Sequence, residues 1–166
     1  MSIPKITIII VSVILVLAAV YFWHTPIKIE EAIWQPNVTI NEHNFIVEVL
    51  YSDEEKRQGL ANEDFLLEDN GILFLFDIKK VRTFWMKDMK FNIDLLWIDD
   101  QEIVGIEKLM LAPESDILYK DLIKYDSPKL INKVLEFPAG TVDKYSIQVG
   151  DTINFDIYDR NKMEGN

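Results

Sequence analysis

The chain has 166 residues, 49% of them hydrophobic, which is enough for one domain of ordinary size and short for two. Its 17 basic residues stand against 28 acidic ones, and the net charge of -11 argues against nucleic acid as a partner, because phosphate binding needs a surplus of Lys and Arg. With no cysteine and two histidines, disulfides, thiol nucleophiles and zinc–thiolate sites are excluded and a multi-histidine metal centre is disfavoured. We therefore predict no cofactor and no metal.

An uncharged apolar segment runs from Ile6 to Trp23. At ~1.5 Å rise per residue, a helix of this length just crosses the hydrocarbon core of a bilayer. Its length and its bulky aromatic end favour an uncleaved signal anchor over the two alternatives, a cleaved signal peptide and a buried helix of a soluble protein. With Lys5 before the segment, the positive-inside rule places residues 1–5 in the cytoplasm. We expect a single-pass protein of the cell membrane, partnered by the lipid bilayer, whose C-terminal domain is extracytoplasmic.

The chain after the anchor divides into three parts. Residues 24–37 mix prolines and charges without a sustained period of 2 or 3.6, which predicts an extended linker. Residues 38–160 consist of short strand-like runs separated by turns, and we expect them to form one mainly β domain. Residues 161–166 are a short tail.

The domain begins with a predicted hairpin and a short helix. Val38–Ile40 and Phe45–Leu50 have the β-branched and aromatic content of strands, and a polar turn joins them. Ser52 then opens a Ser-x-x-Glu capping box with Glu55, which predicts a helix that stops near Gly59.

Further strands complete the expected fold. They are predicted at Ile72–Phe76, Thr83–Met86, Ile93–Ile98, Glu102–Leu109, Val134–Phe137 and Thr152–Tyr158. A looser stretch runs from Ala112 to Asn132, and Thr141 is expected to cap a short helical turn before the last strand. Strands so numerous and so short predict a mainly β (α+β) fold, an antiparallel sandwich or barrel-like sheet with one or two short helices, preceded by the transmembrane helix.

Six short motifs follow one another between residues 45 and 158. They are Arg57–Leu60, Asp69–Phe74, Phe84–Met89, Ile93–Asp94, Leu135–Gly140 and Gly150–Asp151. In this order they resemble the family called domain of unknown function 192, also known as uncharacterised protein family 0127. The resemblance implies a compact, mainly β fold. It implies no reaction, because the family has no established activity.

Two acidic residues interrupt predicted apolar strands. At the period of 2 that strands impose, Asp94 shares a face with Leu96 and Ile98, and Glu136 shares a face with Val134. Leaving a charge buried without a partner is strongly unfavourable. Each carboxylate is therefore expected at the lip of a cleft or beside a cation.

Cationic and aromatic residues near these motifs complete a candidate site. Arg57, Arg82 and Lys87 are the candidate partners of the two carboxylates. The functional interpretation is a largely apolar cleft whose ligand-binding residues are Trp85, Met86, Lys87, Asp94, Glu136 and Arg57.

Three functions remain open for this cleft. The favoured one is a binding domain that holds a small molecule, a glycan or a peptide. The first alternative is a hydrolase that uses Asp94 and Glu136 as an acid/base pair. The second is an envelope interaction module in which both carboxylates are purely structural.

Overall fold

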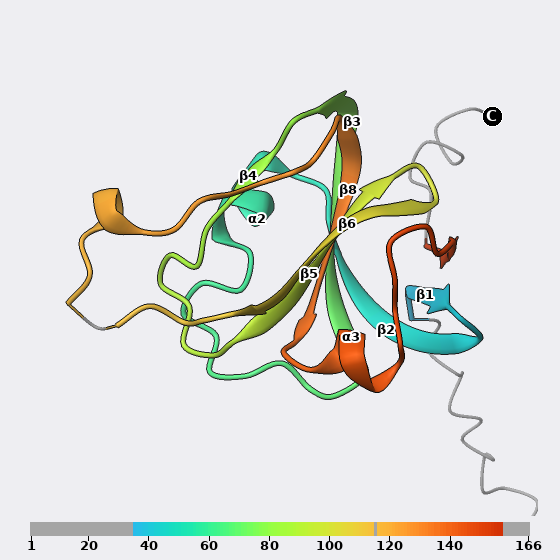
Figure 1. Ribbon diagram of the computed structural model, residues 1–166, viewed down its shortest axis with the longest axis horizontal. Helices are drawn as coiled ribbons and strands as arrows, with labels where there is room; N and C mark the ends of the chain where they lie inside the picture. Colours follow the sequence, from blue (N-terminus) through green and yellow to red (C-terminus); the bar gives the residue numbers. More distant parts are fainter. Residues whose placement is uncertain (1–34, 115, 158–166) are drawn as a thin grey trace, which may run out of the picture. The chain divides into compact units, whose positions relative to one another are not determined.

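The computed structural model describes residues 35–114 and 116–157. Seven strands form one sheet in the order β6-β5-β8-β3-β2-β1-β9 (Figure 1). Their bounds are β1 Asn37–Ile40, β2 His43–Leu50, β3 Asn70–Lys80, β5 Ile93–Asp99, β6 Glu102–Met110, β8 Ile131–Pro138 and β9 Ile153–Asp156. The helices are α2 Asp53–Gln58, α3 Thr141–Lys144 and the 3-10 turn η1 Tyr119–Asp121. The predicted mainly β fold with short helices is confirmed.

The predicted membrane anchor, residues 6–23, lies outside the described residues. So do residues 24–34 of the predicted linker and the predicted tail. Within residues 35–114 and 116–157, no helix is both long and apolar enough to cross a bilayer.

Local sequence signals account for the first elements. β1 and β2 form the expected hairpin, and its turn residues Asn41 and Glu42 both have positive φ, at 48° and 69°, as tight hairpin turns require. The capping box is also present, because the Glu55 amide donates to Ser52 Oγ at 3.2 Å and the Ser52 amide donates to Glu55 Oε2 at 2.7 Å. Helix α2 ends before Gly59, as predicted.

One strand pair corrects the expectation of an antiparallel sheet. β2 and β3 run parallel, with Ile46 opposite Asn70 and Leu50 opposite Phe74, whereas the other pairs of the sheet are antiparallel. Parallel neighbours need a crossover connection, and residues 51–69, which contain α2, supply it. The sheet is therefore mixed.

The single sheet curls into a half-barrel, and its two edge strands meet at one end. Glu102, the first residue of β6, bridges to Thr152, which directly precedes β9. The Ile103 amide donates to the Asp151 carbonyl at 3.0 Å, and the Gly150 amide donates to the Ile103 carbonyl at 2.8 Å. These contacts fasten one end of the seam, so the fold is not a sandwich of two sheets.

Two predicted segments differ in detail. The strand predicted at Thr83–Met86 stops at Phe84, because the chain turns at Met86, whose carbonyl accepts from the Met89 amide at 3.3 Å. This short strand, β4 (Thr83–Phe84), pairs with β7 (Tyr125–Asp126) in a separate two-stranded ribbon. β7 and η1 both lie inside the stretch predicted to be loose.

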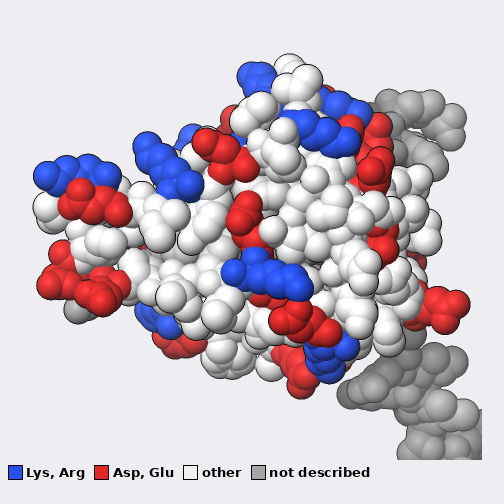
Figure 2. All heavy atoms as spheres, in the orientation of Figure 1, with Lys and Arg blue, Asp and Glu red and all other residues white. Residues whose placement is uncertain are grey.

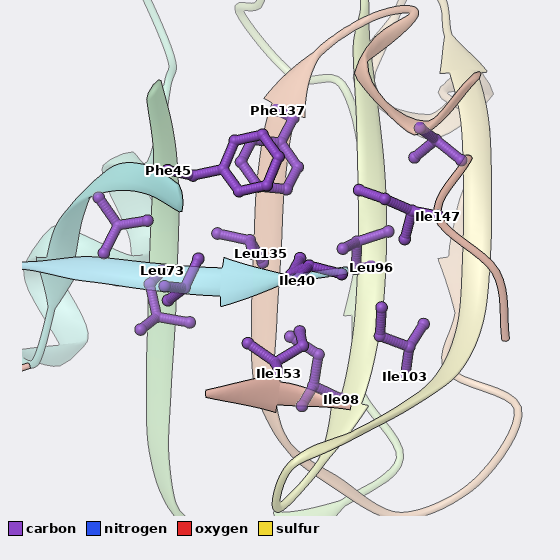
Figure 3. Close-up of a cluster of buried hydrophobic side chains, with 13 residues drawn as sticks. Ile40, Phe45, Leu73, Leu96, Ile98, Ile103, Leu135, Phe137, Ile147 and Ile153 are labelled. Atoms are coloured by element: carbon purple, nitrogen blue, oxygen red, sulfur yellow. The ribbon is translucent and has the colours of Figure 1, made fainter. Parts of the chain in front are cut away.

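The concave, inner face of the sheet holds one hydrophobic core. Phe45 and Phe137 pack against each other with ring centres 4.7 Å apart, as Figure 3 shows. Isoleucine and leucine side chains from six of the seven strands surround them, including Leu96 and Ile98 of β5. Ile147, after α3, packs against the same core.

The outer face holds a second core. Leu95 and Trp97 of β5 point to this side and are fully buried. Leu60, Met86 and Met89, from the segments that follow α2 and β4, cover them. The central strands are therefore buried on both faces, and α2 and the loops beside it enclose the outer face.

Candidate functional site

A pocket with a volume of about 520 Å³ lies on the outer face. Residues of α2 and the loop after it form one wall, and residues 81–89 around β4 form another. Glu136 of β8 reaches the pocket from the sheet. The aromatic residues that line it are Phe74, Phe76, Phe84 and Trp85, and the cationic ones are Lys56, Arg57, Arg82 and Lys87.

The carboxyl group of Glu136 is buried, and its neighbours on the sheet are all apolar. It shares the outer face with Val134, as its position in the strand predicted, and it lies opposite Ile72 of β3 and Leu95 of β5. Only 6% of its surface is exposed. Burial raises the pKa of the Glu136 carboxyl from 4.5 to about 8, and no charge or hydrogen bond of the described residues offsets this shift. The group is therefore protonated at neutral pH, so it can both donate and accept hydrogen bonds.

Asp94 has a different environment, because backbone amides surround it. Its carboxylate accepts from the Leu109 amide at 2.9 Å, from the Gly140 amide at 2.9 Å and from the Val142 amide at 3.0 Å. It is 2% exposed. These three bonds tie the end of β6 to the start of α3. Backbone amides thus take the place of the cationic partners expected for Asp94.

The same geometry corrects the role expected for Thr141. Gly140, in the left-handed region at φ 93°, is the N-cap residue of α3. As a glycine it has no side chain that could cap the helix. Thr141 is the first helical residue, and its hydroxyl donates backwards to the Pro138 carbonyl at 2.7 Å. Asp94, distant in sequence, satisfies the free amides of this turn.

Asp94 and Glu136 project from opposite faces of the sheet. In the antiparallel pair of β5 and β8, Asp94 lies opposite Phe137 and Leu95 lies opposite Glu136. Residues directly opposite each other point to the same side, so Asp94 belongs to the inner face with Phe137, and Glu136 belongs to the outer face. The two carboxyl groups therefore do not form the expected acid/base pair. The hydrolase alternative lacks the paired carboxylates that it requires.

The other predicted site residues divide between the pocket and the core. Trp85, which is 50% exposed, lines the pocket with Arg57 and Lys87. Met86 is 4% exposed and packs in the outer core behind it. The structure thus brings together Trp85, Lys87, Arg57 and Glu136, and it separates Asp94 and Met86 from them.

Two cations of the pocket were not predicted as ligand-binding residues. The Arg82 guanidinium stacks on Phe76, with Cζ 3.9 Å from the ring centre, and donates through Nη2 to the Ile78 carbonyl at 2.8 Å. Lys56 Nζ lies 5.1 Å from the centre of the same ring and donates to the Leu75 carbonyl at 2.9 Å. The alternation of Phe74 and Phe76 in β3 was the sequence signal for an aromatic surface on this face.

The described residues contain no group of three or more His, Cys, Asp or Glu side chains placed to hold a metal ion.

Comparison with known proteins identifies a family and a fold. The model of the DUF192 family, described as "Uncharacterized ACR", matches residues 36–155. A crystal structure of a putative transcription regulator from Sinorhizobium meliloti 1021 is similar, with a TM-score of 0.63, 26% identity and coverage of 73% of this chain and 92% of that one. A protein of unknown function from Novosphingobium aromaticivorans DSM 12444 has a TM-score of 0.62 and 23% identity, covering 71% of this chain and 83% of its own, and shares the fold. No curated protein matches the chain.

Replacing Asp94 by Asn is expected to lower the free energy of unfolding by about 2–4 kcal/mol, because the amide would turn donor atoms toward backbone N–H groups that need an acceptor. Urea denaturation measures the change. Asp143→Asn is the matched control, since Asp143 is an exposed carboxylate of α3 paired only at the surface with Lys108. Equal stability of the two variants would contradict the structural role of Asp94.

Glu136→Gln is expected to change how stability depends on pH. The folded wild type holds the Glu136 proton up to about pH 8, whereas the unfolded chain releases it near 4.5, so wild-type stability falls as pH rises between these values. The variant lacks this decline and should exceed the wild type by on the order of 4 kcal/mol at alkaline pH. Denaturation curves of both proteins between about pH 5 and about pH 9 provide the test. Parallel curves would show that Glu136 is not buried as described.

Proposed function

Because the chain belongs to the DUF192 family, whose activity is uncharacterised, we propose its function from the pocket: it is a binding protein for a small organic molecule. The pocket volume of about 520 Å³ lies within the range of roughly 300–1,000 Å³ that small-molecule sites occupy. Four aromatic residues supply apolar surface, and a few polar groups converge on it. This combination is typical of sites that orient a ligand by its polar atoms.

The observation that carries the proposal is the Glu136 carboxyl at the sheet side of the pocket. A buried polar group without a partner costs free energy, and an apolar side chain at this position would avoid that cost. A ligand hydroxyl, amide or carboxyl group would provide the missing hydrogen-bond partner. The alternative of a pure interaction module accounts for Asp94, whose bonds are all internal, but leaves Glu136 without a role.

We also propose that this binding domain is held outside the cytoplasm by a membrane anchor at residues 6–23. The support is the uncharged apolar segment of the sequence and the position of Lys5 before it. In this arrangement, the pocket would sample molecules of the extracytoplasmic space near the membrane.

The binding proposal is tested on the full chain labelled with 5-fluorotryptophan. Fluorine NMR reports four Trp signals, of which Trp85 lines the pocket and Trp97, fully buried, serves as an internal reference. A panel of small water-soluble aromatic and alicyclic compounds with polar groups is expected to include binders that shift the Trp85 signal more than that of Trp97, which lies outside the pocket lining and contacts it through Phe84. Glu136→Leu should weaken these binders by about tenfold, and Glu136→Gln, which keeps the hydrogen-bonding atoms, should weaken them less. A panel in which no compound moves the Trp85 signal would overturn the proposal.

The anchor proposal is tested by cell fractionation. The full chain is expected to stay in the membrane pellet after a carbonate wash, because burial of the apolar helix in lipid does not depend on charge. A variant that lacks residues 1–23 should appear in the soluble fraction. Release of the full chain by carbonate would refute the anchor.

A further inference from the structure

The charge of the pocket is opposite to the charge of the chain. The chain carries -11, and on the face drawn in Figure 2 Lys and Arg side chains lie beside Asp and Glu side chains in most places. The pocket lining instead holds four cations against two carboxylates that are not deeply buried, Asp53 and Asp88. With Glu136 protonated, the lining has a positive balance, and such a site attracts anions in a protein that otherwise repels them.

Three of the four cations already have carboxylate neighbours at the surface. Arg57 forms an ion pair with Glu54. Lys56 Nζ lies 3.6 Å from Asp53 Oδ1, and Lys87 Nζ lies 3.7 Å from Asp88 Oδ2. These pairs involve solvent-exposed carboxylates, and exchanging such a partner for a ligand anion costs little.

Arg82 is the exception, because its guanidinium has no carboxylate partner among the described residues. Stacking on Phe76 and the bond from Nη2 to the Ile78 carbonyl hold the plane of the group in place. Its Nε atom is buried and has no hydrogen-bond acceptor within the described part of the chain. Because Nε is buried, an anion in the pocket would bind to the remaining N–H groups of the two Nη atoms, and an oriented guanidinium end of this kind is suited to a carboxylate or another planar oxyanion.

The rest of the lining is compatible with an anion that has an apolar body. Trp85, half exposed, and the partly exposed Phe76 and Phe84 rings offer surface for such a body. Glu136 does not repel an anion while it is protonated, and its proton can be donated to a ligand oxygen.

We propose that the ligand of this pocket is an organic anion, with an apolar or aromatic body against the Phe and Trp side chains and an oxyanion group bound by Arg82. This inference rests on the binding function proposed above and names the ligand class. The rival class is an organic cation, which would bind to an ionised Glu136 among the aromatic rings. The cationic lining and the absence of an ionised carboxylate at the sheet side of the pocket favour the anion.

Three probes of nearly equal size and shape separate the classes: benzoate, benzamide and benzamidinium. With the fluorotryptophan-labelled full chain, we expect benzoate to shift the Trp85 signal with an affinity about tenfold higher than that of benzamide. Benzamidinium should bind more weakly than benzamide. Tighter binding of benzamidinium than of benzoate would overturn the proposal in favour of the cation, and equal affinities of all three would overturn it while leaving a binding function intact. If none of the three probes shifts the Trp85 signal, the proposal of an organic anion as ligand is also overturned.

Variants at Arg82 test whether this residue causes the preference for benzoate over benzamide. Arg82→Gln should lower the ratio of benzoate affinity to benzamide affinity from about tenfold to about one. Arg82→Lys, which keeps the charge and loses the planar fork, should retain part of the preference. Lys80→Gln removes an exposed charge of β3 outside the pocket and is the matched control, with an expected change of less than about twofold. The Trp97 signal of each variant without ligand verifies folding. A benzoate preference that survives in Arg82→Gln would contradict the role of this residue.

Discussion

The central strands of the sheet are apolar on both sides, and this constraint decides how the rest of the chain is arranged. β5, the first half of β3 and residues 134–137 of β8 are buried almost without interruption, so the sheet needs a cover on each face. The inner face is covered when the sheet curls on itself. The outer face is covered by the crossover that contains α2 and by the loop after β4. The pocket lies between these two covering segments, where their side chains do not fill the space above Glu136.

The two carboxylates of the central strands illustrate how surroundings determine the role of one chemical group. Asp94, on the inner face, accepts three backbone hydrogen bonds that join β6 to α3. Glu136, on the outer face, has only apolar neighbours on the sheet, and desolvation makes it a neutral acid at physiological pH. The fold satisfies the Asp94 carboxylate, and it leaves the Glu136 carboxyl without a hydrogen-bond partner among the described residues. One face of the sheet thus holds a carboxylate that joins two segments, and the other face holds the carboxyl group that lines the pocket.

Signals local in sequence predicted much of this architecture. The hairpin at Asn41–Glu42 and the capping box at Ser52 are encoded within a few residues, and the period of 2 predicted which neighbours share a face with Asp94 and with Glu136. Whether those two faces are the same depends on the register of β5 against β8. This register joins segments about forty residues apart, and no periodic pattern in the sequence encodes it. The parallel pair did leave a signal, because a helix between two strands is typical of a crossover. The stacking of Arg82, just after β3, on Phe76 of that strand places Arg82 in the pocket, and no pattern in the sequence predicts this contact.

The position of β9 has a consequence for how the domain acquires its fold. This strand pairs with β1, the first strand, and the residue before it bridges to β6, at the other edge of the sheet. The half-barrel therefore cannot close until residues 152–156 have been made, and a nascent chain that ends before them exposes the inner apolar face. Because Asn37 of β1 lies opposite Asp156 of β9, closing the sheet joins segments that are far apart in sequence, and such contacts are typical of slow folding.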